Sequence, residues 1–133
     1  MKSFRQMKKW TLMSVLLCGI SLAAYAIIPQ VRIMWWTLTD ITSTSAHLVV
    51  LHQGASYFRL DVCTPEGERV EWHYHHPGAT SPEEEIFSVM DIENLTPNTT
   101  YMLKILVKGL PGDTDHVSAD STQLYFTTEP ELR

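Results

Sequence analysis

The chain has 133 residues, enough for one domain, and carries ten basic and fifteen acidic side chains for a formal net charge of −5. This acidic balance opposes binding to polyanions, so nucleic acid is not an expected partner. The sequence contains neither a Gly-x-Ser-x-Gly motif nor a glycine-rich phosphate loop, so we expect no enzyme and no cofactor.

The first 26 residues predict an N-terminal helix that is either a signal peptide or a membrane anchor. Four basic residues precede an apolar stretch, and Ala24-Tyr25-Ala26 is a small-x-small pattern that suits signal peptidase. The positive flank favours translocation of the residues after the apolar stretch, so the rest of the chain is expected to be secreted, periplasmic or on the cell surface. The apolar stretch over residues 10–28 approaches the roughly 20 residues that span a bilayer, so an uncleaved anchor is the alternative.

Without this segment, residues 27–133 carry a formal charge of −9 and a single cysteine, Cys63. An internal disulfide is then excluded, and the core must depend on apolar packing. Two arguments about Cys63 disagree. Cysteines in strands are usually buried, but the alternation of its own strand points Cys63 outward.

The exported part predicts an all-β fold. Short β-rich runs recur between clusters of Gly, Pro, Asn and Asp, and no helical periodicity is present. Residues 27–36 form a lead-in and a possible first strand, residues 37–130 the domain and residues 131–133 a tail. The seven expected strands are 31–37, 46–51, 57–64, 70–75, 86–92, 100–107 and 122–128. They predict an immunoglobulin-like sandwich of two sheets, in which each strand buries one face.

The run 70–75 alternates clearly. Val70, Trp72 and Tyr74 share one face, whereas Glu71, His73 and His75 share the other. This pattern predicts a buried aromatic face and an exposed polar one.

The segment Asn94-Leu95-Thr96-Pro97-Asn98-Thr99-Thr100-Tyr101 resembles the corner before the penultimate strand of fibronectin type III domains. In this resemblance Leu95 plugs the core, Pro97-Asn98 supports a tight turn, and Tyr101 returns its hydroxyl to nearby backbone. Thr99 is the remaining member of this structural motif. The similarity extends from about Thr37 to Pro130 and implies a fibronectin type III-like sandwich.

Two features of that family are missing. Its second strand usually carries a tryptophan, but this chain has Val49-Val50-Leu51, so Trp72 or the pair Trp35 and Trp36 is expected to fill the space. The segment 109–121 lacks the Arg-Gly-Asp tripeptide that the family uses to bind integrins. Integrin binding is therefore not expected.

Two groups of side chains could hold a metal ion. His73 and His75 lie two residues apart on one strand face, with Glu71 as a third candidate ligand. We favour an exposed polar face over this site because two histidines at this spacing are a weak motif. Acidic residues in the two long loops could bind calcium, but their spacing matches no dedicated motif. They are Glu83, Glu84, Glu85, Asp113, Asp115 and Asp120.

The sequence therefore predicts a non-enzymatic binding or adhesion module, whose partner is another protein or a surface glycan. Its candidate surfaces are an exposed sheet edge and the long loops, which carry Glu83, Glu84, Asp113 and Asp115. Trp36 is a further candidate, because neighbouring tryptophans in a strand point to opposite sides. Two alternatives remain: a structural subunit that assembles with itself through an edge strand or Cys63, and a metal-binding protein that uses His73 and His75.

Overall fold

The computed structural model describes residues 30–131 of the chain. The predicted targeting segment, with its proposed cleavage point at Ala26, lies outside the described residues, as does the N-terminal helix expected there. Between residues 30 and 131, no helix has the length and apolar character needed to cross a bilayer.

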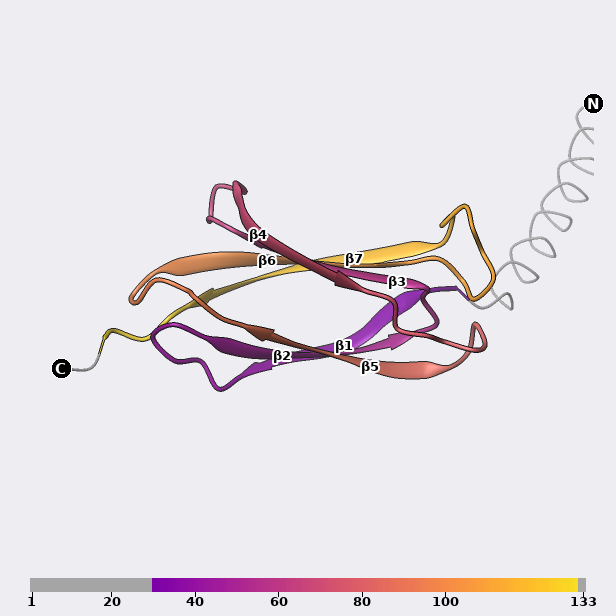
Figure 1. Ribbon diagram of the computed structural model, residues 1–133, viewed down its shortest axis with the longest axis horizontal. Helices are drawn as coiled ribbons and strands as arrows, with labels where there is room; N and C mark the ends of the chain where they lie inside the picture. The colour runs from indigo at the N-terminus through magenta and orange to yellow at the C-terminus, as the bar shows by residue number, and fades with distance from the viewer. Residues whose placement is uncertain (1–29, 132–133) are drawn as a thin grey trace, which may run out of the picture.

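Seven strands form two sheets that stack face to face (Figure 1). One sheet has the order β1-β2-β5 and the other β4-β3-β6-β7, and every neighbouring pair is antiparallel. The prediction of an all-β, two-sheet fold with seven strands is therefore confirmed. The strands are β1 (Arg32–Thr39), β2 (Ala46–Gln53), β3 (Tyr57–Cys63), β4 (Arg69–His75), β5 (Glu85–Ile92), β6 (Thr100–Lys108) and β7 (Ala119–Thr127).

The core lies between the sheets and is built by alternation along the central strands. In β2, β3 and β6 every second side chain is buried, because successive residues of a strand point to opposite faces, and all of these side chains except His52 are apolar. Full burial of a valine, leucine, isoleucine or phenylalanine side chain contributes about 1.5–3 kcal/mol to the free energy of unfolding. Members with no exposed surface include Leu48, Val50, Phe58, Leu60, Val62, Leu103, Ile105 and Val107.

The corner between β5 and β6 joins the two sheets. The backbone N–H of Thr96 donates to the hydroxyl of Tyr101 over 2.8 Å, and the N–H of Leu95 donates to the carbonyl of Thr44 over 2.9 Å. Leu95 is itself buried in the core, while the hydroxyl of Thr99 donates to the carbonyl of Pro97 over 2.9 Å. The turn is thus fixed at both ends by side chains of the resemblance motif.

Strand β4 is oriented opposite to the prediction. Val70, Trp72 and Tyr74 are 56%, 46% and 53% exposed, so the expectation that they are buried is wrong. The register with β3 sets this orientation, since it pairs Leu60 with His73 and places the histidine face on the core side. Because β4 is an edge strand of a four-stranded sheet that faces a three-stranded one, its inner side need not be apolar. Trp72 consequently does not replace the tryptophan missing from β2.

Cys63 is buried, with 1% of its surface exposed, although alternation places it on the outer side of β3. A register shift between Val62 and Cys63 ends the regular pairing there. The β3–β4 turn covers the position, since Gly67 lies next to Met102, the register partner of Cys63 on β6. Burial raises the pKa of the Cys63 thiol, so the form that makes disulfides is disfavoured.

Candidate functional site

An aromatic stripe lies on the outer face of the β4-β3-β6-β7 sheet. The Trp72 ring stacks on Tyr74 with 5.3 Å between centroids, and Tyr74 stacks on Tyr57 of β3 with 6.0 Å. The stripe exists because Tyr57, Trp72 and Tyr74 are on the outer side of neighbouring strands. Its two β4 members keep about half of their surface exposed.

Basic side chains are interleaved with the stripe. The guanidinium carbons of Arg59 and Arg69 lie 5.1 and 5.9 Å from the centre of the Trp72 ring, and the Lys108 ammonium lies 4.8 Å from the centre of the Tyr57 ring. Cations within about 6 Å of an aromatic face are attracted to its quadrupole. These contacts hold long, flexible side chains in place on an open surface.

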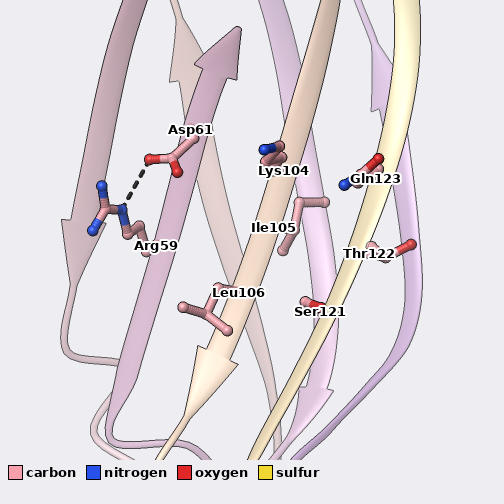
Figure 2. A pocket seen from close by; sticks show the side chains of 8 residues that line it. All are labelled: Arg59, Asp61, Lys104, Ile105, Leu106, Ser121, Thr122 and Gln123. Atoms are coloured by element: carbon pink, nitrogen blue, oxygen red, sulfur yellow. Dashed lines mark hydrogen bonds and ion pairs between the residues drawn. The ribbon is translucent and has the colours of Figure 1, made fainter. Parts of the chain in front are cut away.

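Beside the stripe, a shallow groove of about 330 Å³ runs over β3, β6 and β7 (Figure 2). Its lining combines two cations, one carboxylate, hydroxyl and amide groups and an apolar floor. Arg59 joins the groove to the stripe because it belongs to both. The lining residues are Arg59, Asp61, Lys104, Ile105, Leu106, Ser121, Thr122 and Gln123.

The charges in the groove are arranged so that the cations are not fully neutralised. The Nε–H of Arg59 donates to Asp61 over 2.9 Å, which raises the pKa of the guanidinium, while its terminal nitrogens point away from Asp61 (Figure 2). Among the described residues, Lys104 makes no ion pair. In the four strands of this sheet, Asp61 is the one carboxylate on the outer face. The groove can therefore attract an anion.

The acidic loop residues predicted as interaction sites lie elsewhere, at the end of the sandwich where β1 begins. Glu84 accepts hydrogen bonds from the backbone and hydroxyl of Thr80, and these bonds lower the pKa of its carboxyl group. The carboxylate of Asp113 accepts from the backbone N–H groups of Asp115 and Val117 over 2.9 and 3.1 Å, with the same effect on its pKa. Both side chains stabilise their own loops. For Glu83 we see no such bond in the described part of the chain.

Trp36 lies apart from those loops. It is 37% exposed and, with Trp35 and Met34, lines a second depression of about 370 Å³ between β1 and β7. Its register partner Val50 is buried, so Trp36 belongs to the inner side of an edge strand and shields the open side of the sandwich.

The structure brings the weak metal candidates to one face of β4 but does not assemble a site. The Nε2 atom of His73 lies 3.0 Å from Oε1 of Glu71, without hydrogen-bond geometry, and no other described group bonds to this buried nitrogen. His75 instead bonds to Ser88 of β5 over 3.0 Å. Over residues 30–131, no group of three or more His, Cys, Asp or Glu side chains could hold a metal ion.

Two histidines and one serine form a polar chain inside the core, which the sequence did not indicate. Nδ1 of His52 lies 2.8 Å from the carbonyl of Gly54 and must donate to it, so Nε2 of the neutral ring accepts the Ser88 hydroxyl over 2.7 Å. The Ser88 oxygen then accepts from Nε2–H of His75. His52 has no exposed surface and Ser88 only 2%. This polar chain satisfies buried polar groups. The Ser88 hydroxyl within it is buried, so no substrate can reach it.

The groove was also not found from the sequence. In the sequence, Arg59 and Asp61 indicate only a solvent-exposed strand face. Lys104 and Gln123 are isolated polar residues in other strands. Their proximity results from the pairing of β3, β6 and β7, where Asp61 opposes Lys104 and Lys104 opposes Gln123.

No family model matches this chain, and no curated protein matches it. Solved structures do resemble it. A computationally redesigned β-sandwich protein is 19% identical with a TM-score of 0.45, and the match covers 76% of this chain and 97% of that one. The sensor domain of an anti-sigma factor from Pseudobacteroides cellulosolvens is 18% identical with a TM-score of 0.49, over 80% and 94% of the two chains.

A β-glucuronidase from Ruminococcus gnavus also resembles the chain, with 14% identity and a TM-score of 0.45. The match covers 76% of this chain but only 16% of the enzyme. At such identities the likeness concerns the sandwich fold alone.

Proposed function

We propose that this protein is an exported, non-enzymatic binding module of fibronectin type III type that uses the outer face of its β4-β3-β6-β7 sheet. The observation that carries the proposal is the exposed stripe of Tyr57, Trp72 and Tyr74, held among arginine and lysine side chains. The basic flank and apolar stretch of residues 1–26 support export. The corner around Tyr101 supports the fibronectin type III type.

The amino-acid composition of this face is typical of a binding surface. Tryptophan, tyrosine and arginine are the residues that contribute most to binding energy at protein surfaces. Rings already held by stacking and cation–π contacts lose little conformational freedom when a partner arrives. An aromatic surface held in place in this way supports binding as its use.

A pull-down from envelope and medium fractions of the native host tests the proposal. The bait is the full-length chain in mild detergent, compared with its Trp72→Ala and Tyr74→Ala variants. We expect a reproducible partner that both substitutions release. Phe87→Ala is the matched control, because Phe87 is 61% exposed on the other sheet. Capture that all four proteins share would place binding elsewhere and contradict the proposal.

Self-assembly is a second candidate function, favoured by the outer face of the β1-β2-β5 sheet. Register brings Trp35, Val49, Leu51, Phe87 and Val89 together there, and three of them are about half exposed or more. Copies of an acidic domain repel one another, and this repulsion is weakest where two uncharged patches meet. The exposed apolar patch therefore fits a second copy of this chain.

Sedimentation velocity of the full-length chain across a wide concentration range tests self-assembly. We expect a dimer that Val89→Asp dissociates, with β4 variants unaffected. A monomer at every concentration would exclude this second candidate.

A further inference from the structure

The charge of the domain is segregated. Residues 30–131 contain fifteen acidic but only five basic side chains, and four of the five lie on the outer face of the β4-β3-β6-β7 sheet. These four are Arg59, Arg69, Lys104 and Lys108. Because the acidic majority lies elsewhere, this face is the place at which the protein can attract an anion.

From this arrangement we infer that the groove and the aromatic stripe together bind an acidic saccharide, a sugar chain that carries carboxylates. The inference rests on the proposed function and names its ligand class. Lys104 would pair with the carboxylate, which prefers such charge-assisted hydrogen bonds. The terminal nitrogens of Arg59 lie on the far side of Asp61 and carry positive charge toward Trp72 (Figure 2).

The rest of the groove fits the remainder of a sugar ring. Sugar hydroxyls both donate and accept hydrogen bonds, and the Ser121 hydroxyl and Gln123 amide do the same. Leu106 offers an apolar floor to the C–H side of the ring (Figure 2). The groove volume of about 330 Å³ lies at the lower end of the range for small-molecule sites, which suits one or two sugar units.

The stripe extends the groove along the sheet. Sugar rings present flat faces of C–H groups, which pack against aromatic rings and displace ordered water from them. Trp72 and Tyr74 lie next to Arg59, so a chain anchored in the groove would continue over them. Trp72 and Tyr74 contact each other and two guanidinium groups, so a sugar would pack on the roughly half of each side chain that stays exposed.

Other anionic ligands fit this face less well. A bilayer is flat, and it cannot enter a depression whose cations are partly buried. Nucleic acid carries a charge on every nucleotide, so a strand that left the groove would meet the acidic majority of the domain. A saccharide with sparse carboxylates avoids both problems.

Binding measured by calorimetry tests the inference with three carboxylated probes: polygalacturonate, alginate and hyaluronan. Each is compared with its carboxyl-reduced form, which keeps the backbone and loses the charge, and with single-stranded DNA. We expect the full-length chain to bind at least one acidic probe, more weakly as salt rises, and to bind its reduced form and DNA at least tenfold more weakly.

Variants locate the site. Lys104→Gln and Trp72→Ala should each weaken binding by about tenfold, because the first removes a charge-assisted contact and the second a stacking surface. Lys104→Glu should abolish binding. Phe87→Ala, on the other sheet, should leave it unchanged, and a thermal melt of each variant verifies folding.

The outcomes separate this inference from the proposed function. Absence of binding to all three acidic probes, or equal binding of the reduced forms or DNA, would overturn the saccharide inference. If the pull-down partner is then a protein that Trp72→Ala still releases, the proposed function stands. If neither a saccharide nor any partner depends on this face, both fail.

Discussion

At the scale of single residues, the polar chain through His52, Ser88 and His75 is the main departure from an apolar core. Both ring nitrogens of His52 and the Ser88 hydroxyl have partners, which removes the cost of about 1–3 kcal/mol that an unsatisfied buried group carries. The arrangement requires a neutral His52 ring, because its Nε2 accepts the Ser88 hydroxyl. Burial lowers the pKa of both His52 and His75, so the neutral form persists in the folded protein.

These lowered pKa values predict acid sensitivity. Below about pH 6.5 the histidines of the unfolded chain bind protons that the folded protein refuses, so the free energy of unfolding falls as pH falls. For the fully buried His52 the slope approaches about 1.4 kcal/mol per pH unit. Urea unfolding at pH 7.5, 6.5 and 5.5 measures this. His76→Gln should keep most of the dependence, because burial is the larger cause of the lowered pKa of His75 and the charge of His76 the smaller one. A stability that is level across this range would contradict the prediction.

Tyr101→Phe is the second prediction at this scale. The substitution removes the hydroxyl that accepts from Thr96 and leaves that N–H without its partner. We expect a loss of about 1 kcal/mol in the free energy of unfolding by urea denaturation. Tyr125→Phe serves as the control, because Tyr125 is 60% exposed and its hydroxyl makes no hydrogen bond within residues 30–131. Equal effects at both positions would argue against the corner bond.

At the scale of elements, β4 decides where the candidate site lies. Its period-2 pattern is clear in the sequence, but the same pattern suits either orientation of the strand. The register with β3 selects the orientation that exposes Trp72 and Tyr74. Had the strand been turned over, the aromatic rings would be in the core and the outer face would lack its stripe.

Trp72→Ala tests this orientation through stability. Truncation of a core tryptophan costs about 3–5 kcal/mol, but at a half-exposed position on an edge strand we expect about 1 kcal/mol or less. Leu60→Ala, on the buried side of β3, should cost about 2–5 kcal/mol in the same denaturation experiment. A loss at Trp72 as large as that at Leu60 would show that the strand buries its aromatic face.

The β6–β7 loop offers a matched pair of glycines. Gly109 and Gly112 both adopt positive φ, 81° and 83°, so alanine is strained at each by a similar amount. At Gly109 the added methyl group would also collide with Ser56 and with the ring of His116, whereas at Gly112 it meets open space. We expect Gly109→Ala to be the more destabilising in a thermal melt, by roughly 1 kcal/mol or more. Equal melting temperatures would contradict this loop structure.

At the scale of the whole molecule, the two outer faces of the sandwich differ in chemistry. One is aromatic and basic, whereas the centre of the other is apolar and uncharged. The long loops at the end where β1 begins carry much of the negative charge. The domain therefore has three distinct surfaces on one small fold.

The acidic excess predicts a salt effect on stability. Like charges repel in the folded domain, and raising NaCl from about 10 to about 300 mM screens them. The melting temperature should rise by a few degrees, which corresponds to about 1 kcal/mol or less for a domain of this size. The double substitution Glu83→Gln with Asp115→Asn should reduce the rise. A melting temperature that falls with salt would mean that attractive pairs dominate.

The sequence alone determined the all-β class, the number of strands and the corner at Tyr101, because alternation, turn residues and one local motif act over short distances. Only the tertiary structure decided the orientation of β4, the burial of Cys63 and the groove. Each of these depends on which residues of neighbouring strands face one another. A shift of one residue exchanges the two faces of a strand without changing its pattern, so the site depends on register, which is a property of the assembled sheet.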